Sequence, residues 1–283
     1  MNRRDIILGA TGLFALAPIK GAAKTEPFRL GLTPVFLNND REILSASKSY
    51  LEAQMEREVE FVQRRTYEEI TNLLLVGDLD AAWICGFPFL KNRSDLALVA
   101  VPVWRGASLY QSYLIAGAER AAAGWDDLKG DLHAYSDPDS NSGYLVTVSE
   151  LLKRNRRAEE FFDRTIFTFG HRNVVRAVAS GLSGSGSVDG YVWEALATLE
   201  PELTRRTKVI WKSEMLGFPP FACRAGEEAS EQVVTFRRAL LDMAQSGEGR
   251  DILGQLQLDG FQRANAVLFA GIQSRIDIVA RKA

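Results

Sequence analysis

The sequence predicts an α/β protein with two lobes, each a mainly parallel sheet flanked by helices. Three observations lead to this prediction: a length of 283 residues, an ordinary globular composition with 46% hydrophobic and 25% charged residues, and short apolar runs that alternate with stretches of helical period. The length suits two domains or one large one. The alternation is typical of βα units, in which helices connect parallel strands.

The first lobe is predicted from a series of elements that begins at Phe28. Its helices are expected at 41–57 and 67–76, where apolar residues recur with helical period. Four apolar runs predict its strands, at 28–33, 59–64, 81–84 and 96–103.

The second lobe is predicted from a similar series, with helices near 144–154 and 173–179. The tail at 230–282 has helical period almost throughout, and we expect it to pack back onto the first lobe. Five apolar runs predict strands, at 111–116, 132–135, 166–169, 188–192 and 209–211. The predicted limits of the lobes are 24–112 with 214–283 for the first and 113–213 for the second.

The first 23 residues have the pattern of an export signal. Paired arginines, Arg3 and Arg4, precede an apolar run at 6–19 that is too short and too interrupted to span a bilayer. The small residues Gly21-Ala22-Ala23 follow, as a signal peptidase requires. We therefore expect residues 1–23 to be a twin-arginine export signal, with a membrane anchor or a buried amphipathic helix as the alternative. The mature protein is then periplasmic, with no stable membrane insertion.

The charge balance and the scarcity of cysteine and histidine exclude several classes of protein. With 34 Lys and Arg against 36 Asp and Glu, the chain lacks the basic excess of a nucleic-acid-binding protein. Two cysteines without a CxxC spacing, and two histidines, provide neither a disulfide framework nor a structural zinc site. We expect no metal, no cofactor and no nucleic-acid partner. Cys85 and Cys223 could pair in an oxidising compartment, but their spacing does not decide this.

We predict that the protein is not an enzyme. The sequence contains no GxSxG elbow, HExxH helix, Walker loop or strand-linked GxGxxG. Ser185 or Ser187, with His171 and Asp189, supplies the residue types of a catalytic triad. The serine-glycine patch at 183–187, however, is expected to be a mobile surface loop that cannot hold a nucleophile in place. No catalytic residue is predicted.

A serine-rich turn between a predicted strand and a predicted helix is the most informative segment. In the stretch Ser-Asp-Pro-Asp-Ser-Asn-Ser-Gly at 136–143, Ser140, Asn141 and Ser142 stand where the first free N–H groups of the helix point outward. These amides, the neighbouring hydroxyls and the helix dipole can hold an oxyanion without a lysine. The alternative is that Ser140 or Ser142 only caps the helix.

Several short motifs follow one another in an order that resembles a known family. Ser140-Asn141-Ser142-Gly143 is similar to a phosphoryl-binding Ser-Thr-Ser-Gly loop, with Asn141 in the threonine position. The other matching segments are Gly77-Asp78-Leu79-Asp80-Ala81-Ala82-Trp83, Tyr110-Gln111-Ser112, Asp127-Leu128-Lys129-Gly130, His171, Ala177-Val178-Ala179-Ser180-Gly181 and Val188-Asp189-Gly190. Together they resemble the periplasmic phosphate-, phosphite- and phosphonate-binding components of ABC importers over most of residues 28–225.

The resemblance implies a two-lobed periplasmic-binding-protein fold that closes by a hinge on a small oxyanion and delivers it to an ABC permease. It implies that Ser140, Asn141, Ser142 and the Gly143 amide contact the anion. Tyr110 would close over the anion from the other lobe, and His171 would add a donor; packing or capping is the alternative role of both.

One departure from the family concerns the far end of the ligand. The family members that select aminophosphonates carry an acid in the loop that is here 216–221, and no acid occupies it. We therefore expect the far end of the pocket to be apolar, with Glu194 as the nearby acid to examine.

Cys85 supports an alternative function. It follows a predicted strand end, so we expect it to border the crevice between the lobes as either an inert buried residue or a soft thiolate ligand. One branch of the resembled family senses trivalent arsenic through a cysteine. The alternative is therefore a periplasmic sensor that binds arsenic through Cys85 and signals to a histidine kinase.

Overall fold

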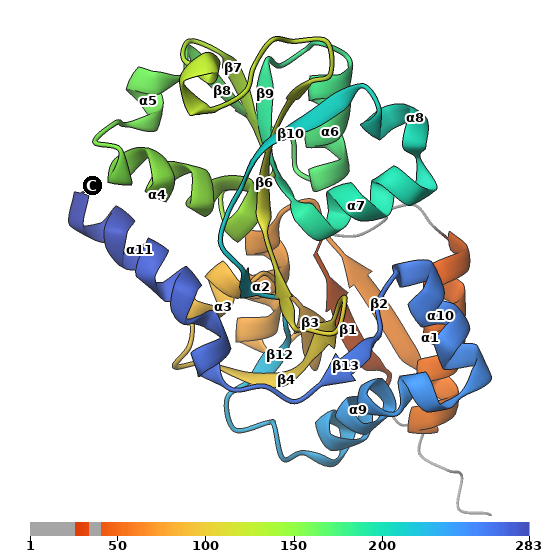
Figure 1. The fold of residues 1–283 in the computed structure, drawn as a ribbon. Coiled ribbons are helices and arrows are strands. Elements are labelled where there is room, and N and C mark those ends of the chain that lie inside the picture. The colour runs from red at the N-terminus through yellow and green to blue at the C-terminus, as the bar shows by residue number, and fades with distance from the viewer. Residues whose placement is uncertain (1–25, 34–40, 283) are drawn as a thin grey trace, which may run out of the picture.

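The computed structural model describes residues 26–33 and 41–282 and consists of two α/β lobes, one above the other in Figure 1. The predicted export signal lies outside the described residues. A six-stranded sheet in the order β13-β4-β12-β3-β1-β2 forms the centre of the first lobe, and a five-stranded sheet in the order β10-β6-β9-β7-β8 that of the second. The predicted two-lobed α/β fold is therefore confirmed. Within the described ranges no helix is both long and apolar enough to cross a membrane.

The first lobe combines the start of the chain with its last third. Its strands are β1 (Phe28–Leu32), β2 (Val59–Gln63), β3 (Ala81–Trp83), β4 (Leu96–Val103), β12 (Phe221–Arg224) and β13 (Gly260–Gln262). Its helices are α1 (Arg41–Met55), α2 (Tyr67–Val76), α3 (Gly86–Lys91), α9 (Glu231–Leu241) and α10 (Gly247–Leu256), with short 3-10 turns at Met243–Gln245 and Ala266–Phe269.

The second lobe is formed by the middle of the chain. Its strands are β6 (Ser112–Gly117), β7 (Leu132–Tyr135), β8 (Arg164–Phe167), β9 (Ser185–Asp189) and β10 (Thr207–Lys212). Its helices are α4 (Val146–Lys153), α5 (Ala158–Phe161), α6 (His171–Ala179), α7 (Gly190–Leu199) and α8 (Pro201–Thr204), with a 3-10 turn at Trp125–Leu128. Where the chain passes between the lobes, β5 (Leu109–Tyr110) pairs with β11 (Leu216–Gly217).

Parallel pairing is confined to the strands that end at the boundary between the lobes. β2, β1 and β3 are parallel, and so are β8, β7 and β9. The strands that begin at this boundary run the other way: Ser112, at the start of β6, pairs with Asp189 at the end of β9. The carboxyl ends of the parallel strands in both lobes therefore face the same boundary, where α/β proteins place ligands.

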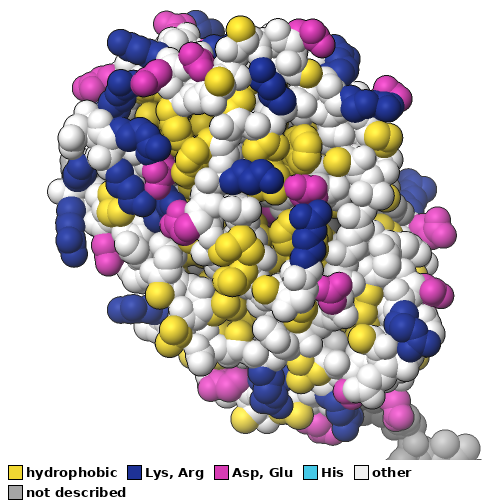
Figure 2. Space-filling view, viewed as in Figure 1, with side chains coloured by type: hydrophobic (Ala, Val, Ile, Leu, Met, Phe, Trp, Pro, Cys, Tyr) yellow, Lys and Arg dark blue, Asp and Glu magenta, His cyan; other side chains and the backbone are white. Residues whose placement is uncertain are grey.

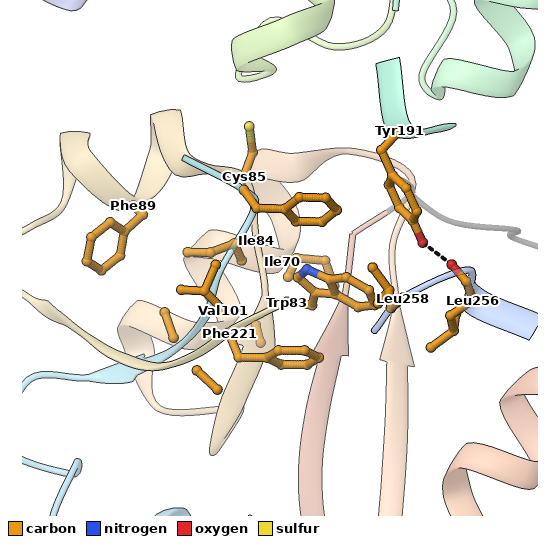
Figure 3. Packing of buried hydrophobic residues seen from close by; sticks show 14 of the residues in the cluster. Ile70, Trp83, Ile84, Cys85, Phe89, Val101, Tyr191, Phe221, Leu256 and Leu258 are labelled. Carbon is orange, nitrogen blue, oxygen red and sulfur yellow. Dashed lines mark hydrogen bonds between the residues drawn. The ribbon is translucent and has the colours of Figure 1, made fainter. Parts of the chain in front are cut away.

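One apolar core continues across the boundary. Trp83 stacks on Phe221 with ring centroids 4.9 Å apart, and Tyr191 of α7 reaches from the second lobe to donate a hydrogen bond to the Leu256 carbonyl of the first (Figure 3). Outside this core, basic and acidic side chains are interspersed over the face seen in Figure 2. This mixture agrees with the balanced net charge.

The serine-glycine patch is not a mobile surface loop, so that prediction is wrong. Ser185, Gly186 and Ser187 belong to β9, a buried strand in the middle of the second sheet. The two serine hydroxyls lie 2.8 Å from the ring nitrogens of His133, and a Cβ on Gly186 would lie 2.5 Å from Val174 Cγ1. Small residues are present because the layer above the strand is tightly packed.

Other elements differ from the prediction in position. β8 and β9 begin two and three residues before the predicted runs at 166 and 188, and α7 occupies residues that were in part assigned to a strand. The tail contains β13 in addition to helices. Its last helix, α11 (Ala270–Lys282), contacts α3 of the first lobe, as expected, and also α4 of the second (Figure 1). This helix therefore bridges the two lobes.

The contact between α11 and the second lobe is centred on Arg275, whose side chain is 1% exposed. The guanidinium donates to Ser149 Oγ at 2.8 Å and Glu150 Oε1 at 3.0 Å in α4, and to both carboxylate oxygens of Glu214 after β10. We call Arg275, Ser149, Glu150 and Glu214 the arginine clamp.

Candidate functional site

The serine-rich turn leaves the carboxyl end of β7 at the boundary between the lobes. Asp137 shapes the first part of the turn: its Oδ1 accepts the Asp139 amide at 2.8 Å and its carbonyl accepts the Ser140 amide at 3.0 Å. Ser140 Oγ then accepts the Gly143 amide at 3.0 Å. The chain continues as one turn of π-helix (Asn141–Leu145) directly into α4. Such π-helical turns are frequent at functional sites.

Gly143 is required by close packing beneath the turn. A Cβ at this position would lie 1.8 Å from Ser136 Oγ and 3.0 Å from His171 Cε1. Neither neighbour has room to retreat, because Ser136 and His171 are both buried. The glycine therefore lets the turn lie directly on α6 and the end of β7.

Three residues of the first lobe meet the turn and its neighbour His171 from the opposite side. Tyr110 Oη accepts a hydrogen bond from Asn141 Nδ2 at 2.8 Å, and Cys85 Sγ accepts one from the Asn141 amide at 3.2 Å. Tyr67, at the start of α2, donates its amide to Asp137 Oδ2 at 3.2 Å and places its hydroxyl 3.2 Å from His171 Nε2. In Figure 3 the Cys85 sulfur points away from the first-lobe core toward the second lobe. The turn is therefore enclosed between the two lobes.

Hydrogen bonding fixes the tautomer of His171. Its Nδ1 accepts the Asp189 amide at 3.1 Å, so in the neutral ring the proton is on Nε2. Burial lowers the pKa of His171 to about 3, which keeps the ring neutral. Nε2–H then donates to Tyr67 Oη, and the Tyr67 hydroxyl hydrogen is left free to donate to a further acceptor.

Two phenols and a thiol at this boundary are also neutral. Burial raises the pKa values of Tyr67 and Tyr110 well above that of an ordinary tyrosine, so both phenols keep their protons. Burial raises the pKa of the Cys85 thiol to about 12. Each hydroxyl is therefore a neutral hydrogen-bond donor, and Cys85 is a thiol that accepts an amide hydrogen rather than a thiolate ligand.

Two buried polar atoms in the same place have no hydrogen-bond partner in the described residues: Ser136 Oγ and Asn141 Oδ1. Leaving a buried polar atom unpaired costs roughly 1–3 kcal/mol, and such atoms in a folded protein often face a ligand or ion. Ser140 and Asn141 are fully buried, and Ser142 is 1% exposed. The boundary therefore holds a sheltered polar cluster that is only partly satisfied by the protein itself.

The structure brings all seven residues singled out in the sequence to this one place: Cys85, Tyr110, Ser140, Asn141, Ser142, Gly143 and His171. Sequence analysis missed Tyr67 as a site residue. Its only local signal was its position after Thr66, the N-cap of a helix that begins at the carboxyl end of β2. We call these seven residues and Tyr67 the interlobe cluster.

Glu194 is bound to residues outside the interlobe cluster, and the two cysteines do not form a disulfide. Glu194 accepts a hydrogen bond from Tyr113 at 2.9 Å and pairs with Arg105 at 3.3 Å. Cys85 and Cys223 are both free thiols and do not pair. In the part of the chain that the structure describes, no group of His, Cys, Asp and Glu side chains has the arrangement of a metal site.

Comparison with known proteins identifies the family. A family model described as the periplasmic substrate-binding protein of phosphonate ABC transporters matches residues 31–268. The chain belongs to this family. It is 28% identical over 200 residues to the phosphate-import protein PhnD of Mycolicibacterium smegmatis, a match that covers 65% of this chain and 62% of that protein.

Two solved structures of similar proteins have the same fold. The binding component of an ABC phosphonate transporter from Pseudomonas aeruginosa superposes with a TM-score of 0.81 at 24% identity, covering 89% of this chain and 86% of its own. PhnD1 from Prochlorococcus marinus, in complex with methylphosphonate, superposes with a TM-score of 0.78 at 16% identity, covering 89% and 98%. The predicted family resemblance is confirmed.

Proposed function

We propose that this protein is an exported periplasmic binding protein that captures a small phosphorus oxyanion, phosphate, phosphite or a phosphonate, for an ABC permease. The observation that supports this proposal most strongly is the interlobe cluster. It is a buried set of neutral donors that both lobes contribute and that lies around the start of the π-helical turn and α4. Neutral dipoles and a helix start are suited to holding an anion away from water. Its partners are the oxyanion and the permease, and it has no catalytic role.

In this proposal the oxyanion lies against Ser140, Asn141 and Ser142, and the Gly143 amide, which donates to Ser140 Oγ at 3.0 Å, holds the turn in place. Tyr67 and Tyr110 donate their hydroxyl hydrogens to it from the first lobe. His171 acts through Tyr67, because its Nε2–H already donates to Tyr67 Oη. Cys85 Sγ accepts the hydrogen of the Asn141 amide, and the side chain packs beside the anion. Cys85 is not proposed to be a ligand for arsenic, since its Sγ already accepts this amide hydrogen.

The two lobes are the moving units in this proposal, with limits at 24–112 with 214–283 and at 113–213. The crossings near Gln111 and Ser213 act as hinges: the Gln111 side chain donates to the Ser213 carbonyl, and the Ser112 amide donates to Ser213 Oγ at 2.9 Å. A ligand favours closure only if it binds the closed form better. Donors from both lobes provide that difference, because they surround the anion only when the lobes meet.

Calorimetric titration of the mature chain with phosphate, phosphite and methylphosphonate tests the proposal. At least one should bind, and Ser140→Ala should weaken it by roughly tenfold or more, since a hydrogen bond to a charged group contributes about 1.5–3 kcal/mol. Ser180→Ala, which removes an exposed hydroxyl at the end of α6, is the matched control. The proposal fails if none of the three binds. It also fails if Ser140→Ala binds as wild type does while Cys85→Ser abolishes the binding of arsenite.

A further inference from the structure

The segment before α2 in the first lobe and the segment before α6 in the second meet at two points. The inner point is part of the interlobe cluster: the Tyr67 hydroxyl lies 3.2 Å from His171 Nε2, and both side chains are buried. At the outer point the guanidinium carbon of Arg65 lies 4.4 Å from the centroid of the Phe169 ring. The two contacts are two residues apart in both segments. A cation–aromatic pair at the rim therefore lies beside a polar pair in the site.

Phe169 has a backbone conformation that is unfavourable for a bulky residue. Its φ is 52°, in the left-handed region that favours glycine. Hydrogen bonds on both sides hold this conformation: the Thr168 amide donates to the Tyr135 carbonyl at 2.9 Å, and the Gly170 amide donates to the Ser136 carbonyl at 3.3 Å. Phe169 therefore lies at the tip of a turn that is tied to the end of β7.

Packing within the second lobe does not account for the place of the Phe169 ring. In the part of the chain that the structure describes, Phe169 belongs to neither of the two apolar clusters, and it is half-buried. The ring instead carries the guanidinium of Arg65, an exposed residue of the other lobe. A strained residue whose side chain contacts the opposite lobe points to a role in closure.

The first-lobe half of this contact lies at a capped helix start. Arg65 precedes Thr66, the N-cap of α2, which forms a capping box with Glu69. The Tyr67 amide donates to Asp137 Oδ2 of the second lobe at 3.2 Å. Because Arg65 and Tyr67 belong to the same fixed segment, a contact that holds Arg65 against the second lobe also holds the Tyr67 hydroxyl at the site.

We propose that Arg65 and Phe169 form a latch that keeps the lobes closed over the bound oxyanion and positions the Tyr67 hydroxyl. This inference rests on the proposed function and adds two positioning residues that act through Tyr67 and His171. The latch contact forms only when the lobes meet, so it slows the opening that precedes release of the ligand. It leaves association unchanged, because the anion enters before the contact forms.

Stopped-flow fluorescence tests the latch, with the mature chain and its tightest binder among phosphate, phosphite and methylphosphonate. Trp104 of the first lobe packs on Tyr191 of the second with ring centroids 5.5 Å apart, so opening should change the emission. Arg65→Gln and Phe169→Leu should each raise the dissociation rate about two- to fivefold, the range that an exposed cation–π contact supplies. The association rate should stay that of the wild type.

The double variant distinguishes one shared contact from two independent effects. Arg65→Gln combined with Phe169→Leu should release the ligand no faster than either single variant, since each removes the same contact. Arg65→Lys, which keeps a cation over the ring, should restore most of the slow release. Arg64→Gln is the matched control, because it removes the same charge from an exposed neighbour that donates to the Gln63 carbonyl at 2.8 Å.

Three results would overturn the latch and leave the proposed function intact. They are unchanged release in Arg65→Gln, additive effects in the double variant, and a salt-dependent fall in the association rate with unchanged release, which would assign Arg65 to attraction of the anion. If Phe169→Leu does not fold, Arg65→Gln and Arg65→Lys carry the test. If none of the three oxyanions binds, the latch and the proposed function fail together.

Discussion

Two polar regions connect the lobes, and they differ in charge. The interlobe cluster is built from neutral groups, and its buried acceptor Asn141 Oδ1 is unpaired in the described residues. The arginine clamp at the edge is ionic: the buried guanidinium of Arg275 is surrounded by two carboxylates and a hydroxyl. The clamp is satisfied by the protein alone, whereas the cluster keeps an unpaired acceptor and is the site at which we propose that the anion binds. In this proposal the contact between the lobes and the recognition of the anion depend on different residues.

The largest effect is expected from breaking the clamp. Arg275→Met removes the charge and keeps most of the volume, and it should lower the free energy of unfolding by about 3 kcal/mol. This is the lower end of the range for a broken buried ion pair, because Glu150 keeps Lys153 and Arg154 and Glu214 is half-exposed. Urea denaturation measures the loss, with Lys282→Met on the exposed end of α11 as the control. A loss no larger than that of the control would show that the clamp does not stabilise the protein.

The next largest effect is expected from crowding the cluster. Gly143→Ala places a methyl group on Ser136 and should cost about 1–3 kcal/mol, as overpacking does. Because the displaced turn carries the proposed anion contacts, affinity should fall by roughly ten- to a hundredfold. Gly117→Ala is the control, since a Cβ there meets open space. If Gly143→Ala bound the oxyanion with unchanged affinity, the turn would not be part of the binding site.

A smaller and more selective effect is expected from Tyr67→Phe. Removing the hydroxyl deletes the donor that His171 directs toward the ligand, and oxyanion affinity should fall by about tenfold. The free energy of unfolding should fall by about 1–3 kcal/mol, because the buried Nε2–H of His171 loses its acceptor while the ring remains packed. Tyr144→Phe, outside the cluster, should bind as wild type does. If Tyr67→Phe lowered the stability and left the oxyanion affinity unchanged, the Tyr67 hydroxyl would be a structural contact only, as the arginine clamp is.

The smallest effect is expected at the solvent-exposed rim. Lys91 of the first lobe pairs with Asp139 of the second at 2.9 Å, but the lysine side chain is 49% exposed. Lys91→Met should change oxyanion affinity by less than about fivefold, because exposed pairs contribute at most about 1 kcal/mol. The difference should vanish in high salt, which screens such pairs. A larger, salt-resistant loss would mean that charge at the rim contributes to recognition.

Two serine-rich segments show how far the sequence alone could lead. The 136–143 turn could be interpreted because Pro138 and the helical period after it fix a strand-turn-helix order, and local order determines where free amides point. The 183–187 segment has a similar composition, but its environment is set by His133 and Val174, which are distant in sequence. Composition therefore predicted a loop where tertiary packing requires a buried strand.

The same distinction explains the missed site residue. Tyr67 becomes relevant only through its contacts with Asp137 and His171 in the other lobe, and no local pattern encodes these contacts. The bridging role of α11 also depends on a partner, α4, more than a hundred residues away in the chain. The sequence predicted the helix, but the match between Arg275 and Glu150 emerges only when the two helices pack together.

A crystal structure of the protein grown with its tightest-binding oxyanion tests the central claim most directly. The account predicts an anion enclosed between the lobes, within hydrogen-bonding distance of the Tyr67 and Tyr110 hydroxyls on one side and the 140–142 turn on the other. An anion bound to one lobe only, or held by lysine and arginine side chains at the surface while the turn keeps only its contacts with the protein, would contradict it.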